Sequence, residues 1–426
     1  MQTKVPKLAR NVVIVGAGIS KFGRQPKKTS RDLFLQAFRE SLQSVDHGIY
    51  PKDIESLFLG NYSGDTFEKQ THLGPLMADW IGLPEIPAIR IENACASSGA
   101  AFRQGVMAIA SGMHEVVLVG GVEKMTDPSL THATDYLALA ADKVFEFENA
   151  ALTFTSSFAI MASAYMDRYD IGPEHLMRVA IKNHENGSLN PKAQFNYTIA
   201  ELMEKSIRNL KTKGISTPDW NNEIDFLQDE QINPPIAWPL KLFDCSPISD
   251  GASCLILTSE EVASSFTNVP VSVVASGQAS ATSLADREDL TSVPSTKQAA
   301  QLAYTMAGIG PDDINLSEVH DCFTIAEVIT TEDLGYFPPG YGALAVAEGL
   351  TNRDGQKPIN ASGGLKSKGH PVGATGVAQI AEIWMQLRGE AGDHQITDRD
   401  LQYGLAQNLG GSGNSSLVTI LKKGLT

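Results

Sequence analysis

The sequence has few cysteines, few basic residues relative to acidic ones, and no long apolar run. Its four cysteines, Cys95, Cys245, Cys254 and Cys322, form no Cys-x-x-Cys pair, which disfavours a disulfide framework and a zinc ribbon. A formal charge of -15 argues against nucleic acid or an anionic membrane as the main partner. No apolar run reaches the roughly 18 residues of a membrane-spanning helix. The basic N-terminus leads directly into the strand-like "NVVIVGAG", so we expect no signal peptide and a cytoplasmic location.

The chain contains an internal repeat. With 426 residues, 42% of them hydrophobic, it is long enough for two or three domains. The segment "GIYPKDIESLFLG" from Gly48 recurs as "GIGPDDINLSEVH" from Gly308, with Gly, Ile, Pro, Asp and Ile in register. Each copy follows a helical pattern and leads into a β-rich run. The repeat predicts two copies of one α/β unit, each with a mixed sheet covered by helices.

A second pair of segments extends the repeat. Helical spacing follows Cys95 in "ASSGAAFRQGVMAIASG" and His370 in "PVGATGVAQIAEIWMQLRG", and a strand-like run comes after each. Between the copies, a polar stretch rich in Asn, Lys, Asp and Glu indicates an inserted subdomain. The predicted parts are a first half of residues 1–126 with 244–265, a loop domain of residues 127–243, and a second half of residues 266–426.

The repeat also pairs two reactive side chains. Cys95 opens the helix of the first copy and His370 opens the helix of the second, so a two-fold relation between the copies brings them together. A helix N-terminus and a nearby imidazole lower the pKa of a thiol from ~8.5 towards neutrality, and the thiolate is the nucleophilic form. An isolated cysteine is more often a small buried hydrophobe, but its place in the repeat favours Cys95 as a nucleophile.

These residues carry a resemblance to a known family. From about residue 10 to the C-terminus the sequence is similar to the thiolase superfamily. "NACASSG" resembles the nucleophile motif, "GGVEKMT" the block after it, and "SPISDGA" the return strand; "GGLKSKGHPVGATG", from Gly363 to Gly376, is the most specific of these motifs. The resemblance implies an α/β protein with the duplicated thiolase fold: five layers, αβαβα, with mixed sheets and an inserted loop domain.

One motif departs from the common thiolase pattern. In "NLGGSG", Asn408 stands where many thiolases carry the cysteine of a Cys-x-Gly motif. The tetrapeptide "HDCF" at residues 320–323 resembles the branch of sterol-carrier-protein-type thiolases and related acetoacetyl-CoA thiolases, in which its cysteine takes over proton transfer. In this chain the resemblance gives that role to Cys322. No role for Asp321 follows from the sequence.

The resemblance also implies a mechanism. His370 takes the proton of Cys95, whose thiolate forms an acyl-enzyme with a thioester, and Cys322 is the second acid/base. His320 and His370 are the candidates for stabilising an enolate oxygen. The backbone N–H groups of Cys95 and Gly410 are the candidates for stabilising the tetrahedral oxyanion.

The expected substrates are acyl-CoA and CoA, with no tightly bound cofactor and no metal. Ser246 matches a family serine near the pantetheine arm, although a turn serine beside Pro247 explains it equally well. Lys366 and Lys368 are either guides for anionic CoA or, as is more usual, solvated lysines. A metal site within HDCF is disfavoured because adjacent residues on a strand point to opposite faces.

Three functions stay open on the sequence. The first is a CoA-dependent thiolase, an acetyl-CoA C-acetyltransferase or 3-oxoacyl-CoA thiolase that makes or cleaves a carbon–carbon bond by Claisen chemistry. The second is a decarboxylating β-ketoacyl-synthase-like enzyme that uses Cys95, His320 and His370; the thiol of HDCF disfavours it, because decarboxylation supplies a carbanion without a thiol base. The third is a catalytically silent subunit, or a thiolase subunit that needs a partner protein for substrate channelling, because the resemblance implies relatives that work alongside a small OB-domain protein and a second condensing enzyme. The resemblance further implies a homodimer or tetramer.

Overall fold

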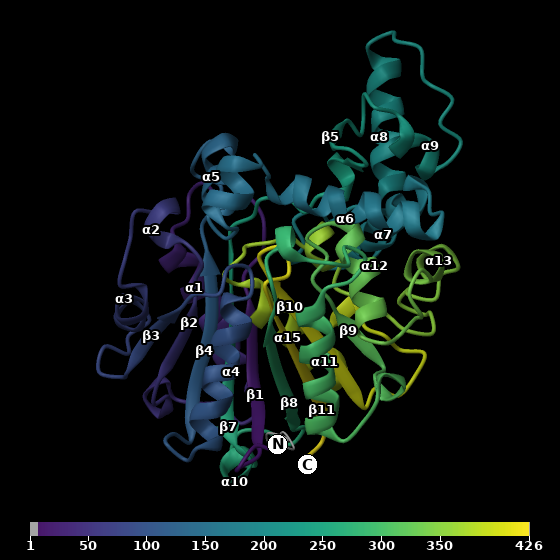
Figure 1. Cartoon of the computed structure of the whole chain (residues 1–426). Coiled ribbons are helices and arrows are strands. Elements are labelled where there is room, and N and C mark those ends of the chain that lie inside the picture. The colour runs from purple at the N-terminus through teal and green to yellow at the C-terminus, as the bar shows by residue number, and fades with distance from the viewer. Residues whose placement is uncertain (1–6, 426) are drawn as a thin grey trace.

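The computed structural model describes residues 7–425. A nine-stranded mixed sheet runs through the protein (Figure 1). Its strand order is β3-β2-β4-β7-β1-β8-β11-β10-β9. The strands of the first half are β1 (Val12–Ile19), β2 (Leu57–Gly60), β3 (Ala88–Ile91), β4 (Val116–Glu123) and β7 (Gly251–Ser259). The strands of the second half are β8 (Val271–Ser280), β9 (Leu316–Glu318), β10 (Tyr403–Gly410) and β11 (Ser415–Lys423).

Strand order and direction repeat in the two halves, which confirms the predicted duplication. In the first half β2 pairs parallel with β4, β4 antiparallel with β7, and β7 antiparallel with β1. In the second half β9, β10, β11 and β8 follow the same order with the same directions. The first strands of the two copies, β1 and β8, pair antiparallel at Val12–Ile14 and make the sheet continuous.

Helices between and outside the half-sheets give the five predicted layers. Helices α4 (Ser97–Ala110) and α15 (Thr375–Arg388) bury their apolar faces in a central core shared by strands of both halves. Helix α1 (Ser30–Gln43) covers the outer face of the first half, and α11 (Pro294–Ala307) that of the second. Local signals set the helix ends: Thr29 caps α1 in a capping box, and glycines with positive φ end α11 and α15.

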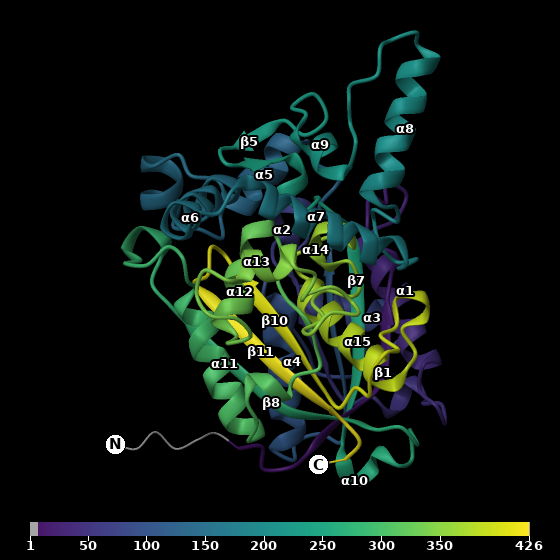
Figure 2. The ribbon, with the colours of Figure 1, turned by 90° about the vertical axis from the view of Figure 1, so that its right-hand side faces the viewer.

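The loop domain lies between β4 and β7 in sequence and over one end of the sheet in space, and α8 projects away from the sheet (Figures 1 and 2). Its boundaries at residues 127 and 243 stay a prediction. It comprises α5 (Leu130–Ala138), α6 (Phe154–Tyr169), α7 (Pro173–Ser188), α8 (Ile199–Thr212), α9 (Glu223–Gln228), β5 (Pro235–Ala237) and β6 (Leu240–Lys241).

None of the helices of residues 7–425 has both the length and the apolar character needed to cross a membrane.

Shorter helices complete the two halves. The shorter helices are α2 (Gly64–Phe67), α3 (Leu73–Trp80), α10 (Glu260–Ala263), α12 (Thr324–Asp333), α13 (Gly342–Ala347) and α14 (Gly364–Ser367).

Candidate active site

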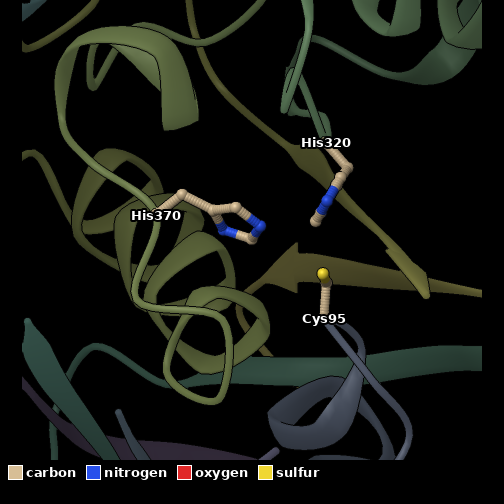
Figure 3. A group of neighbouring side chains, drawn as sticks. All are labelled: Cys95, His320 and His370. Carbon is tan, nitrogen blue, oxygen red and sulfur yellow. The ribbon is translucent and has the colours of Figure 1, made fainter. Parts of the chain in front are cut away.

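Three of the residues singled out in the sequence meet where the two halves join. The sulfur of Cys95 and one ring nitrogen each of His320 and His370 lie within 4.8 Å of one another (Figure 3). Cys95 precedes α4 in the first half, while His320 follows β9 and His370 follows α14 in the second half. The structure therefore brings Cys95 together with two histidines that lie more than 200 positions later in the sequence.

A strained turn presents the Cys95 side chain. Ala94 has φ +49°, a left-handed conformation that non-glycine residues rarely adopt. The Ser97 hydroxyl holds this turn, because it accepts the Asn93 N–H at 2.9 Å and donates to the Ala94 carbonyl at 2.6 Å. Helix α4 begins two residues after Cys95, slightly later than the sequence predicts.

The expectation that the helix start lowers the pKa of the Cys95 thiol is wrong. Burial is the largest influence and, with the nearby Glu123 carboxylate, raises this pKa to about 12. Backbone N–H groups of Gly411 and of Cys95 itself act in the opposite direction. On strand β10's side of the site, the N–H that reaches the sulfur is thus that of Gly411, the residue after Gly410. Cys95 is a neutral thiol until a base removes its proton.

His370 is held as a proton acceptor. Its Nδ1 lies 2.8 Å from the Thr375 hydroxyl oxygen, and that hydroxyl donates to the Pro371 carbonyl at 3.0 Å. Because the hydroxyl hydrogen is used there, the oxygen accepts Nδ1–H and leaves a lone pair on Nε2. Burial lowers the pKa of His370 to about 3, so the ring is neutral. Thr375 was missed in the sequence, although it stands in the quoted motif five residues after His370.

His320 is also buried and neutral. Burial and the neighbouring His370 lower its pKa well below the ordinary value. The two rings are nearly perpendicular, at 87°, with centroids 4.9 Å apart. The backbone N–H of His320 donates to the Gln407 side chain at 3.0 Å, and His320 Nδ1 lies 3.2 Å from Asn408 Nδ2. Strand β10 therefore holds this histidine through two consecutive side chains.

Cys322 lies near Cys95, but its sulfur is not one of the three atoms that lie within 4.8 Å of one another. Burial raises the pKa of its thiol well above the ordinary value, and the neighbouring Cys95 raises it further. The Ser246 N–H donates to the Cys322 carbonyl at 2.9 Å, and Cys245 forms an antiparallel bridge with Phe323. Ser246 thus holds the HDCF segment through its backbone, whereas its contact with pantetheine stays a prediction.

Asp321 ties the HDCF segment to α14, the helix that precedes His370. Its carboxylate accepts the backbone N–H groups of Leu365 at 2.6 Å and Lys366 at 3.1 Å. It also accepts a hydrogen bond from the Asn183 side chain of the loop domain at 2.7 Å. Asp321 therefore anchors the segments that carry Cys322 and His370 to each other.

The interpretation of Lys366 and Lys368 as solvated lysines is wrong, because both are buried. Lys368 Nζ lies 3.7 Å from the carboxylates of both Glu318 and Glu382. Lys366 Nζ lies 5.5 Å from the centroid of the Phe243 ring. Lys368 is therefore placed to balance two buried carboxylates, and Lys366 lies against an aromatic ring. Such partners matter because an unpaired ion in the interior is costly.

Two family models match this chain. Residues 12–261 match the thiolase N-terminal domain, and residues 276–423 match the thiolase C-terminal domain-like family. The chain belongs to the thiolase family. Membership of this family makes the protein an acyltransferase.

Individual relatives agree with the family. The thiolase is 41% identical to an acetyl-CoA acetyltransferase of Methanothermobacter thermautotrophicus over 417 residues, covering 97% of this chain and 100% of that protein. It is 31% identical to human sterol carrier protein 2 over 445 residues, covering 98% of this chain and 73% of that protein.

Solved structures with this fold include the Ltp2–ChsH2(DUF35) aldolase, which has a TM-score of 0.76 at 22% identity and covers 97% of this chain and 98% of that chain. Human mitochondrial 3-ketoacyl-CoA thiolase in complex with CoA has a TM-score of 0.69 at 19% identity and covers 99% of this chain and 100% of that chain. These likenesses confirm the duplicated thiolase fold.

Proposed function

We propose that this thiolase uses acyl-CoA and CoA, and makes or cleaves the carbon–carbon bond of a 3-oxoacyl-CoA through an acyl-Cys95 intermediate. The observation that carries the proposal is the Cys95 thiol beside the neutral rings of His320 and His370, with the Cys322 thiol nearby. The relative named acetyl-CoA acetyltransferase supports acetyl-CoA and acetoacetyl-CoA as substrates.

In the cleavage direction, His370 Nε2 takes the proton of Cys95, and the thiolate attacks the C3 carbonyl of the 3-oxoacyl-CoA. The N–H groups of Cys95 and Gly410 are the proposed donors to the tetrahedral oxyanion, and loss of one such donor typically costs ~3 kcal/mol. Gly410 leaves no room for a side chain, since a Cβ there would lie 2.8 Å from the Asn93 carbonyl oxygen.

The bond between C2 and C3 then breaks and leaves acyl-Cys95 and the enolate of acetyl-CoA. The enolate oxygen accepts hydrogen bonds from His320 and from the now protonated His370. The enolate carbon takes its proton from Cys322. Burial raises the pKa of Cys322, which supports this role because an acid must hold its proton until the step occurs.

CoA completes the cycle. Its thiol gives a proton to the Cys322 thiolate, and its sulfur attacks the acyl group on Cys95. Cys95 leaves as a thiolate and recovers its proton from His370, and acyl-CoA departs. The same steps in reverse condense two acetyl-CoA molecules, with Cys322 removing the α-proton of the second.

The decarboxylating alternative would also use Cys95, His320 and His370. It takes its carbanion from a malonyl group and needs no thiol acid/base, so the buried Cys322 next to Cys95 favours the thiolase reaction. Condensation of malonyl-CoA with acetyl-Cys95 and release of carbon dioxide, in place of CoA-dependent cleavage, would contradict the proposal.

Assembly and location stay predictions. A homodimer or tetramer, an OB-domain partner and a cytoplasmic location are expected from the sequence. The Ltp2–ChsH2(DUF35) aldolase, a similar structure with a second named component, supports the idea of a protein partner.

The proposal is tested by CoA-dependent cleavage of acetoacetyl-CoA and longer 3-oxoacyl-CoA substrates, together with mass spectrometry of the chain after incubation with acetyl-CoA. Cys95→Ser should abolish both cleavage and formation of the acetyl-enzyme. Cys322→Ala should still form acetyl-Cys95 but cleave about 10²–10⁴-fold more slowly, the range for a lost general acid/base.

Cys254→Ala is the matched control, because this thiol is buried in β7 within the outer core of the first half. It should keep the wild-type turnover. Near-normal cleavage by Cys322→Ala would show that the acid/base assignment is wrong. Cleavage by the wild type only after a partner is added would support the partner requirement.

A further inference from the structure

The side-chain amide of Asn408 lies between the nucleophile and His320. Its Nδ2 is 3.1 Å from the Cys95 carbonyl oxygen and 3.2 Å from His320 Nδ1. A carbonyl oxygen can only accept, so the atom facing it is the amide NH₂ group and not the amide oxygen. One N–H is directed to Cys95, and the second is available for His320.

The surroundings of the amide oxygen support the same orientation. Asn408 Oδ1 is buried, and it has no hydrogen-bond partner among residues 7–425. A Cβ at Gly99 would lie 2.7 Å from this oxygen, and one at Gly376 would lie 2.3 Å from it. These glycines stand in the first turns of α4 and α15, whose N–H groups have no acceptor within their own helix and make a positive environment. The oxygen therefore faces two helix starts, and the NH₂ group faces the catalytic residues.

We propose that Asn408 is a positioning residue that holds His320 in the tautomer with hydrogen on Nε2. Because Asn408 donates to Nδ1, that nitrogen presents its lone pair, and the single hydrogen of a neutral imidazole resides on Nε2. His370 is held the opposite way, since Thr375 accepts its Nδ1–H at 2.8 Å. Two histidines whose rings lie 4.9 Å apart thus become one hydrogen-bond donor and one proton acceptor.

The inference rests on the proposed function, which needs His320 to donate to an enolate oxygen. It accounts for an asparagine at the position where many thiolases carry a cysteine: this chain uses the position to orient its donor. The residues Cys95, His320 and His370 are also of the types that bind zinc, and each imidazole would have to offer a nitrogen lone pair. With Asn408 donating to Nδ1 and a hydrogen on Nε2, His320 offers neither nitrogen to a metal ion.

The direct test is ¹H–¹⁵N NMR of the resting enzyme with ¹⁵N-labelled histidine at neutral pH, with His320→Gln used to assign the His320 signals. The wild type should show hydrogen on Nε2 of His320 and on Nδ1 of His370. Asn408→Ala should give a mixture of tautomers at His320 and leave His370 unchanged. Thr375→Val is the matched control, and it should affect the His370 signals alone.

Kinetics provide a second readout. Asn408→Ala should form acetyl-Cys95 at a near-normal rate, because His370 keeps its orientation, while the carbon–carbon bond step slows by up to about a hundredfold, as for a lost oxyanion donor. Hydrogen on Nδ1 of His320 in the wild type would overturn the inference whatever the activity. The expected tautomers in an enzyme that cleaves no 3-oxoacyl-CoA would instead refute the proposed function and leave the inference standing.

Discussion

Replacing Thr375 by valine removes the oxygen that orients His370 without changing the size of the side chain. The wild-type hydroxyl accepts Nδ1–H of His370 at 2.8 Å and donates to the Pro371 carbonyl at 3.0 Å. Valine can do neither. If the ring keeps its tautomer, a buried Nδ1–H is left without an acceptor; if the hydrogen moves to Nε2, the ring is no longer a base towards Cys95.

The magnitude follows from these two hydrogen bonds. A buried donor without an acceptor costs about 1–3 kcal/mol, and every 1.4 kcal/mol is a factor of ten in an equilibrium. The other tautomer escapes this cost, so the fraction of His370 able to act as a base should fall about 5- to 150-fold. The rate of acetyl-Cys95 formation should fall by the same factor. The free energy of unfolding should fall by about 0.5–1.5 kcal/mol, because the hydrogen bond from the hydroxyl to the Pro371 carbonyl is lost in either tautomer.

Single-turnover acetylation of Cys95 by acetyl-CoA, followed by rapid quench and mass spectrometry, measures this rate. Thr331→Val is the control, because the buried Thr331 hydroxyl also donates to a backbone carbonyl, that of Val328 at 2.8 Å, but forms no hydrogen bond with a histidine of residues 7–425. The control should lose similar stability and keep the acetylation rate. An unchanged rate in Thr375→Val, or an equal loss in Thr331→Val, would refute the assignment of His370 as a base oriented by Thr375.

Three further predictions concern stability, each measured by denaturant unfolding. Lys368→Met should lower the free energy of unfolding by about 3–5 kcal/mol, because the buried Glu318 carboxylate loses its cation and Glu382 keeps only His394; a loss under about 1 kcal/mol would contradict the pairing. Gly376→Ala should cost about 1–3 kcal/mol, since its Cβ would lie 2.5 Å from the backbone nitrogen of Gly99, whereas Gly310→Ala should be tolerated because its nearest neighbour would be 3.9 Å away. Burial lowers the pKa of His370 to about 3, so between about pH 6.5 and pH 3 the unfolded ring binds a proton that the folded ring does not. Wild-type stability should therefore fall as the pH drops through this range, and His370→Gln should flatten that slope; equal slopes would show that His370 is not buried neutral.

The duplication and the meeting of Cys95 with His370 could be predicted because the signals that carry them are local. Periodicity, turn residues and the repeat at Gly48 and Gly308 predicted helix, turn and strand in the right order, and the strand order of the two halves agrees. The same repeat placed Cys95 and His370 together. Two expectations failed: the thiol pKa is raised instead of lowered, and the lysines of the histidine motif are buried. Both depend on burial, which a sequence pattern does not measure.

The sequence by itself determined the strands and helices of the repeated segments and the duplication of the fold, and it singled out the side chains that meet between the two halves, because spacing and residue type express these properties. Only the tertiary structure decided how those side chains behave. The role of Asp321 as an anchor depends on its hydrogen bonds to α14, and Asn408 contacts His320 from 88 positions away in the chain. Protonation states and tautomers are set by burial and by partners from distant segments, and those partners meet only once the two halves have packed together.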